Sequence, residues 1–169
     1  MSKGWVCSKC GEWHDGVPFS FAADSPDPYA NLSEAERAKR TVLGTDQCVI
    51  DDKLFFIRGC LEIPIIGSPD PFILGLWVNV FRDHYEAIAG SWDTPGRELN
   101  QGPFKGRLSN SLKAYREAFN LEVTLKIQPV GVRPLIYVDE PNHPLALEQE
   151  NGITIKRAQE IASIALHAG

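Results

Sequence analysis

The run Phe72-Ile73-Leu74-Gly75-Leu76-Trp77-Val78-Asn79-Val80-Phe81 is the most apolar stretch of the chain. Its β-branched and aromatic residues predict a central β-strand, and Gly75 inside it indicates a bulge or the close approach of another backbone. Residues 46–51 and 54–63 are two further β-type runs, and the Asp51-Asp52-Lys53 stretch between their apolar parts predicts a hairpin. These three strands are expected to form the centre of a sheet.

The rest of the chain predicts additional strands and a few short helices around this centre. Strands are expected at residues 104–108, 121–127 and 133–138. Helices are expected at residues 34–43, where Ser33 and Glu36 form a capping box, at 82–89, and after the helix cap Thr154. Successive strands are joined by short turns, so we predict one α+β domain over residues 1–169 with a mainly antiparallel sheet.

Three segments have weaker patterns. Residues 17–32 hold three prolines, which predict an ordered surface loop. Residues 109–119 are compatible with a short amphipathic helix or a turn, and residues 142–152 with a loop or a short turn of helix.

Composition limits the class of protein. A chain of 169 residues with 43% hydrophobic and 23% charged residues is typical of one globular domain. No apolar run is long enough to cross a membrane, and residues 1–5 do not resemble an export signal, so a soluble cytoplasmic protein is expected. The net charge of −5 argues against nucleic acid as a partner, although residues 97–133 carry 7 basic against 3 acidic residues.

The clearest chemical motif lies at the N-terminus, in a short arm of residues 1–16. Cys7 and Cys10 are separated by two residues and followed by Gly11, a spacing typical of a zinc knuckle, in which both thiolates reach one tetrahedral ion. No helix pattern begins after Cys10, which makes a thioredoxin-like redox site less fitting. We therefore expect a structural zinc ion.

Zinc needs four ligands, and the sequence leaves the remaining two open. Cys48 is favoured as the third, because Asp46 and Gln47 suggest a strand edge, and His14 or Cys60 would be the fourth. In the expected hairpin Cys48 lies opposite about residue 56, so Cys60 is about 13 Å further along the strand. Both cysteines could bind one ion only if that strand bends, which Gly59 would permit.

A second group of candidates is His143, Glu148 and Arg58. His143 and Glu148 are close in sequence and could transfer protons, whereas a loop histidine bonded to backbone is the favoured interpretation. Arg58 could bind an anion or lie on a solvated strand face.

Several motifs together resemble one family. They are Cys7-X-X-Cys10-Gly11 with His14, Asp46-Gln47-Cys48-Val49-Ile50, Arg58-Gly59-Cys60-Leu61-Glu62-Ile63-Pro64, Trp77-Val78, Arg133-Pro134, and His143-Pro144-Leu145-Ala146 with Gln149 and Gly152-Ile153. The chain resembles, over nearly its whole length, domain-of-unknown-function family 2199 of bacteria. The resemblance implies one domain and no particular reaction.

The sequence thus favours a non-enzymatic, zinc-stabilised module that binds a partner such as another protein. The alternative is a metal- or histidine-dependent enzyme that acts on a small molecule.

Overall fold

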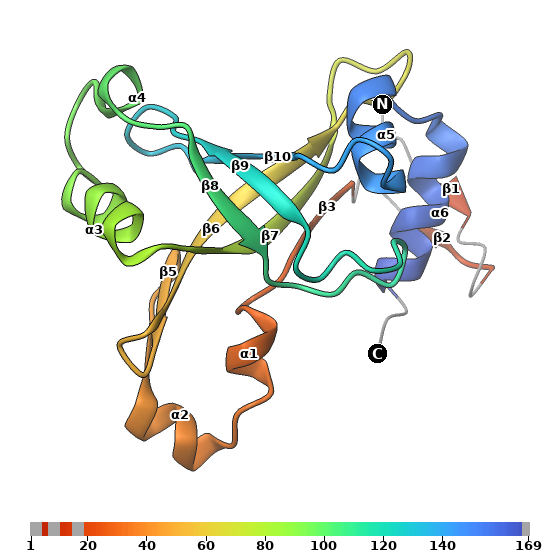
Figure 1. Cartoon of the computed structure of the whole chain (residues 1–169). Coiled ribbons are helices and arrows are strands. Elements are labelled where there is room, and N and C mark those ends of the chain that lie inside the picture. Colours follow the sequence, from red (N-terminus) through yellow and green to blue (C-terminus); the bar gives the residue numbers. More distant parts are fainter. Residues whose placement is uncertain (1–4, 7–10, 15–18, 167–169) are drawn as a thin grey trace.

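The computed structural model describes residues 5–6, 11–14 and 19–166, and these form a mixed α/β single domain (Figure 1). A two-stranded hairpin pairs β1 (Trp5–Val6) with β2 (Trp13–His14). The main sheet contains β3 (Ser20–Ala22), β4 (Thr41–Leu43), β5 (Gln47–Ile50), β6 (Leu54–Ile63), β7 (Phe72–Val80), β8 (Phe104–Leu108), β9 (Glu122–Lys126) and β10 (Leu135–Val138). Their spatial order is β3-β7-β8-β9-β10-β6-β5-β4, and β6 also pairs with β7.

That additional pairing closes β6, β7, β8, β9 and β10 into a five-stranded barrel. Four of its pairings are antiparallel, and the fifth, between β10 and β6, is parallel. The prediction of a mainly antiparallel sheet holds for six of the eight pairings in the main sheet, with parallel pairings at β10–β6 and β3–β7, but the closure of the sheet into a barrel was not predicted. An odd number of strands that run alternately up and down must close with a parallel pair.

Glycine residues let the strand backbones pack closely, and this explains how the barrel closes. A Cβ placed on Gly59 of β6 would lie 2.8 Å from Cγ1 of Ile136 in β10, and one placed on Gly106 of β8 would lie 2.6 Å from the carbonyl oxygen of Asn79. Any side chain at these two positions would push neighbouring strands apart. Gly59 therefore serves the β10–β6 contact, rather than bending the strand as the zinc hypothesis required.

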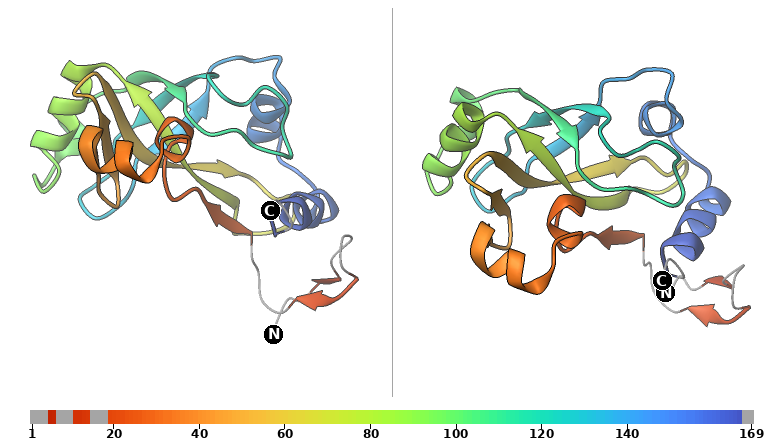
Figure 2. Two further views of the ribbon diagram at one scale, coloured as in Figure 1. Left: turned by 90° about the horizontal axis from the view of Figure 1, so that it is seen from below. Right: turned by 60° about the horizontal axis from the view of Figure 1, so that its bottom comes forward.

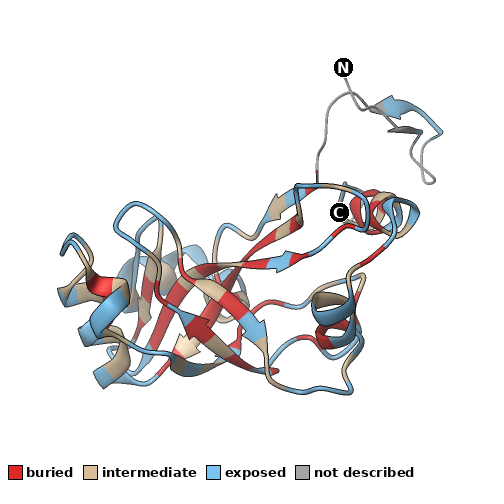
Figure 3. Cartoon of the chain, turned by 90° about the horizontal axis from the view of Figure 1, so that it is seen from above, coloured by how far each residue is buried: buried red, intermediate tan, exposed pale blue. Residues whose placement is uncertain are grey.

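The long β6–β7 hairpin is buried along the whole of one face and over part of the other, which accounts for its apolar sequence. One face lines the barrel interior, where Ile57, Leu61 and Val78 have no exposed surface. The opposite face carries a smaller cluster of buried residues, Cys48, Ile50, Phe56 and Trp77, with Tyr29 and Leu32 packed against it. Figure 3 shows buried residues along these strands and exposed residues on the helices and loops.

Six helices are present in the described part of the chain. They are α1 (Asp27–Ala30), α2 (Glu34–Arg40), α3 (Arg82–Gly90), α4 (Arg97–Asn100), α5 (Pro144–Asn151) and α6 (Ile155–Leu166). Figure 2 shows α1 and α2 on one side of the barrel, and α6 near the end where the chain terminates. None of the helices found among the described residues is both long and apolar enough to span a bilayer.

Most of the expected elements are confirmed, with local differences. The capping box is present, since Ser33 Oγ accepts from Glu36 N at 3.2 Å, but α2 ends at Arg40 and residues 41–43 form strand β4 instead. The β-branched Thr41 and Val42 explain this, because they favour a strand once a partner is available. Residues 109–119 form turns, one of the two forms expected there, whereas residues 144–151 form a complete helix in place of a loop or a single turn.

Candidate functional site

The candidate site lies beside the point on β7 where the strand paired with one of its edges changes from β8 to β3. Along one edge, β7 pairs with β8 at Val78 and Asn79, and with β3 at residues 73–75. The buried Asn110 fills the junction: its Oδ1 accepts from the Trp77 N–H at 2.8 Å, and its Nδ2 donates to the Ser25 carbonyl at 2.9 Å. The side chain of Asn110 thus replaces the strand hydrogen bonds that are missing at this point.

Asp27, the first residue of α1, forms hydrogen bonds to the same junction. Its carboxylate accepts from Asn110 Nδ2 at 3.1 Å and from the Ser111 backbone N–H at 2.7 Å. The backbone N–H of Asp27 donates to the Ser109 carbonyl at 2.8 Å. These bonds hold residues 25–27 against residues 109–111, from which the chain continues across the interior face of β7 towards α6.

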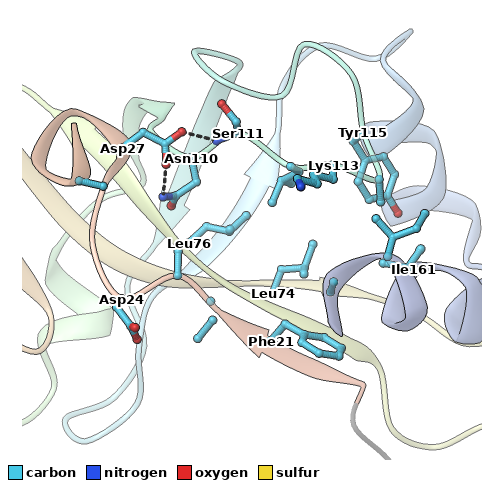
Figure 4. Close-up of a pocket in the computed structure, with 18 of the residues that line it drawn as sticks. Phe21, Asp24, Asp27, Leu74, Leu76, Asn110, Ser111, Lys113, Tyr115 and Ile161 are labelled. Atoms are coloured by element: carbon cyan, nitrogen blue, oxygen red, sulfur yellow. Dashed lines mark hydrogen bonds between the residues drawn. The ribbon is translucent and has the colours of Figure 1, made fainter. Parts of the chain in front are cut away.

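A groove of about 490 Å³ lies below this crossing segment (Figure 4). Its floor is Leu74 and Leu76 of β7 with Phe21 of β3; residues 110–115 form one wall, and Ile161, Ile164 and Ala165 of α6 close one end. Phe21 and Leu74 are paired in register, so their side chains share one face of the sheet. The volume and the mainly apolar lining are typical of small-molecule sites.

The end of the groove near α6 is held by a polar network. Tyr115 lines the groove and donates its hydroxyl to Glu148 of α5 at 2.7 Å. Glu148 in turn accepts from Arg157 Nε of α6 at 3.0 Å, and the Arg157 guanidinium lies 5.5 Å from the centre of the Tyr115 ring. Burial, and then the bond to Glu148, raise the pKa of Tyr115, so this phenol is a fixed donor rather than a base.

Sequence reasoning missed this groove. The three prolines of segment 17–32 predict a loop, whereas residues 20–22 form strand β3 and residues 27–30 form α1. The alternation of Phe19 and Phe21 around Ser20 is the sequence feature that indicates a strand here, but three residues are too few to establish a period of two. Gly75 was the better signal, because a Cβ there would lie 2.9 Å from the Cβ of Ala22 in β3, the close approach that was expected.

Of the predicted zinc ligands, the structure describes His14, Cys48 and Cys60, which belong to different strands. Cys7 and Cys10 lie outside the described residues. His14 belongs to β2, where it pairs with Trp5. Figures 1 and 2 show β5, which carries Cys48, well apart from the β1–β2 hairpin. Among residues 5–6, 11–14 and 19–166, no group of three or more His, Cys, Asp and Glu residues could hold a metal ion.

Cys48 and Cys60 have different surroundings. Cys48 pairs with Phe56, as the hairpin register predicted, but its thiol is fully buried beside Phe56 and Trp77 rather than at a polar edge. Burial raises the pKa of the Cys48 thiol to about 11, which disfavours the thiolate that zinc binds. Cys60 is half-buried and lines a separate cavity of about 260 Å³ between β6 and β10. Burial raises the pKa of Cys60 as well.

His143, Glu148 and Arg58 are not assembled into one site. His143 is the N-cap of α5: its Nδ1 accepts from the Leu145 N–H at 3.1 Å, and its Nε2 lies 2.8 Å from the Arg116 carbonyl, to which it donates. Both ring nitrogens are therefore engaged with backbone. Arg58 lies on β6, where it donates to the Thr45 carbonyl and stacks on Trp77 at 5.7 Å.

The basic residues of the 97–133 segment are largely used within the fold. Arg97 is 4% exposed and donates to four backbone carbonyls, those of Trp92, Gln128, Pro129 and Val132. Lys105, Arg107 and Arg133 form ion pairs with Asp139, Glu122 and Asp46. Asp139 and Asp46 come from outside the segment and Glu122 from within it, so these ion pairs neutralise part of the local positive charge.

Comparison with known proteins gives a family and no further relative. No curated protein and no solved structure matches the chain. The model of a bacterial family described as "uncharacterized protein conserved in bacteria" matches residues 6–153. This match covers the whole barrel, the floor of the groove and its wall of residues 110–115, whereas the α6 residues that close one end lie beyond it. The chain therefore belongs to domain-of-unknown-function family 2199.

Proposed function

We propose that this protein is a binding module and that the groove between β3, residues 110–115 and α6 takes a small, largely apolar molecule. The groove itself carries the proposal: about 490 Å³ of space lies over a floor of leucine and phenylalanine side chains. Transfer of apolar surface from water into such a site is favourable by about 25 cal/mol per Å². The surrounding hydrogen bonds of Asn110 and Asp27 fix its walls, so little ordering is needed on binding.

The uncharged fluorophore N-phenyl-1-naphthylamine tests this function. Its emission should rise on mixing with the protein, because the dye gains fluorescence in an apolar site. Ala165→Trp places a large side chain at the α6 end of the groove and should abolish most of the signal. Ala38→Trp, at an exposed position on α2, is the matched control and should leave the signal unchanged. Equal emission from both variants would show that the dye does not bind in the groove.

The enzymatic alternative has less support from the geometry. Both nitrogens of His143 bond to backbone atoms, and Glu148 already accepts from Tyr115 and Arg157. Neither residue lines the groove. A proton-transfer role would require these bonds to break first.

We also propose that the N-terminal hairpin binds zinc through Cys7 and Cys10, with His14 as a third ligand. Support comes from the pairing of β1 with β2, which makes residues 7–12 the connection of a hairpin, and from the left-handed backbone of Gly11, with φ +72°. Both features are typical of a CxxC metal-binding turn.

Metal analysis of the purified, untreated protein tests the zinc proposal. One zinc ion per chain is expected, lost in the double variant Cys7→Ser/Cys10→Ser and retained in Cys48→Ala. A protein that carries no metal and whose four thiols all react as free groups would show the proposal to be wrong.

A further inference from the structure

The polar groups around the groove differ in whether they are already bonded. The Asp27 carboxylate accepts two hydrogen bonds, both polar atoms of the Asn110 amide are engaged, and the Tyr115 hydroxyl donates to Glu148. Lys113 is different, since its exposed side chain has no hydrogen bond or ion pair with any residue that the structure describes. Figure 4 shows Lys113 on the wall of the groove, between Ser111 and Tyr115 and above the leucines of the floor.

An available cation above an apolar floor selects a particular kind of ligand. We propose that the groove binds a small amphipathic carboxylate, with its apolar tail on Leu74 and Leu76 and its carboxylate at the Lys113 ammonium. This inference rests on the proposed function of the groove. A carboxylate is the complementary anion for a lysine, and such charge-assisted bonds are stronger than neutral ones.

Asp24 also lines the groove and has no hydrogen bond or ion pair with any other residue in the described part of the chain, so its distance from a bound anion matters. Figure 4 shows its carboxylate on the β3 side, turned away from the leucine floor, whereas Lys113 lies on the opposite wall. The carboxylate of Asp27 is also negative, but its two N–H donors already stabilise that charge. An anionic head at the Lys113 wall is thus separated from Asp24 by the width of the groove.

Three ligands share one alkyl tail and differ in the charge of the head group. Their affinities therefore separate the contribution of the tail from that of the charge. Decanoate, 1-decanol and decylammonium are titrated into ¹⁵N-labelled protein below their micelle-forming concentrations, and amide shifts of residues 74–76 and 111–115 report binding in the groove. Decanoate should bind about 5-fold more tightly than decanol, and decylammonium more weakly than decanol. Added salt should reduce the preference for decanoate.

Variants of Lys113 then test whether this residue causes the preference for the carboxylate. Lys113→Ala should bring decanoate to the affinity of decanol, and Lys113→Glu should make decylammonium the preferred ligand of the three. Lys156→Ala removes an exposed lysine of α6 outside the groove and should leave the order unchanged. The amide spectrum of each unliganded variant verifies that it is folded.

The outcomes distinguish the two proposals. Equal affinity for all three ligands at the groove would overturn the carboxylate inference and leave the binding function standing. A decanoate preference that persists in Lys113→Ala would overturn the role of Lys113. Absence of any shift in residues 74–76 and 111–115 with all three ligands would overturn the binding function, and the carboxylate inference with it.

Discussion

The side chain of Asn110 accepts a hydrogen bond from the backbone N–H of Trp77 at 2.8 Å, across 33 positions of sequence. This single contact lies at the point where β8 leaves the edge of β7 and β3 takes its place. It satisfies a buried strand N–H that neither neighbouring strand reaches. The amide nitrogen of Asn110 also bonds to Ser25 and Asp27, so one side chain joins three parts of the chain beside the groove.

Replacement of Asn110 by Ala should destabilise the domain strongly. The change leaves the Trp77 N–H and the Ser25 carbonyl without partners in a buried place, and we expect a loss of about 3 kcal/mol in the free energy of unfolding. Urea denaturation followed by tryptophan fluorescence measures it. Asn142→Ala, at an exposed position, is the control and should change stability by less than about 0.5 kcal/mol. Similar values for both variants would contradict the bridging role.

A methyl group at position 59 should open the barrel. In Gly59→Ala the new Cβ would meet Ile136 Cγ1 at 2.8 Å and the Pro134 carbonyl oxygen at 2.9 Å, so β10 must move away from β6. We expect a loss of about 2 kcal/mol in the free energy of unfolding, with faster hydrogen exchange at the Cys60 amide, which donates to Pro134. Gly90→Ala, where a Cβ would meet nothing within 4 Å, should be neutral. Unchanged exchange at Cys60 would argue against a tight β10–β6 closure.

Alkaline pH should destabilise the fold through Cys48. Its pKa is raised by burial from 9.0 to about 11, so the folded state holds the thiol proton more tightly than the unfolded chain. The stabilisation is complete below pH 9 and is lost as the pH rises towards 11. At about 1.4 kcal/mol per pKa unit, this corresponds to at most about 3 kcal/mol.

Comparison with Cys48→Ala isolates this effect from other groups that titrate in the same range. Urea unfolding at pH 8 and at pH 10.5 should show a larger loss for the natural chain than for Cys48→Ala. A thiol reagent at pH 8 should also modify half-buried Cys60 before Cys48. Equal pH dependence of the two proteins would mean that the Cys48 thiol ionises as easily in the folded state.

His143 should behave as a helix cap. His143→Ala removes the acceptor of the Leu145 N–H and the donor to the Arg116 carbonyl, and we expect a loss of about 1–2 kcal/mol in the free energy of unfolding. Asparagine is a good N-cap, so His143→Asn should recover about half of this loss. Thermal unfolding of the three proteins measures the difference. If Asn is no better than Ala, the cap is not the source of the stability.

The sequence predicted those parts of the fold that are decided over short distances. The β5–β6 hairpin, with Cys48 opposite Phe56, follows from two apolar runs around Asp51 and Asp52, both of which adopt positive φ. The Ser33 capping box and the Thr154 cap follow from side chains that reach backbone atoms three residues away. Such features need no knowledge of the remaining chain.

The candidate groove could not be predicted in the same way. β3 has three residues, and its strand conformation depends on pairing with β7, some fifty positions further on. Lys113 was counted only as part of a basic segment, because nothing in its neighbourhood in sequence indicates Leu74 and Leu76 beneath it. Arg97 belonged to the same count, yet it is buried by carbonyl groups of residues 92 and 128–132.

By itself, then, the sequence determined the strands β5 to β10, the starts of α2, α3 and α6, and the central place of the β6–β7 region. Tertiary structure alone decided that the sheet closes, through the approach of β10 to Gly59, and that the segment after Asn110 crosses the face of β7 to form a groove. The reason is physical. Local structure follows from bonds within a few residues, whereas closure and cavities depend on which distant backbones can come close and on which side chains fill the space between them.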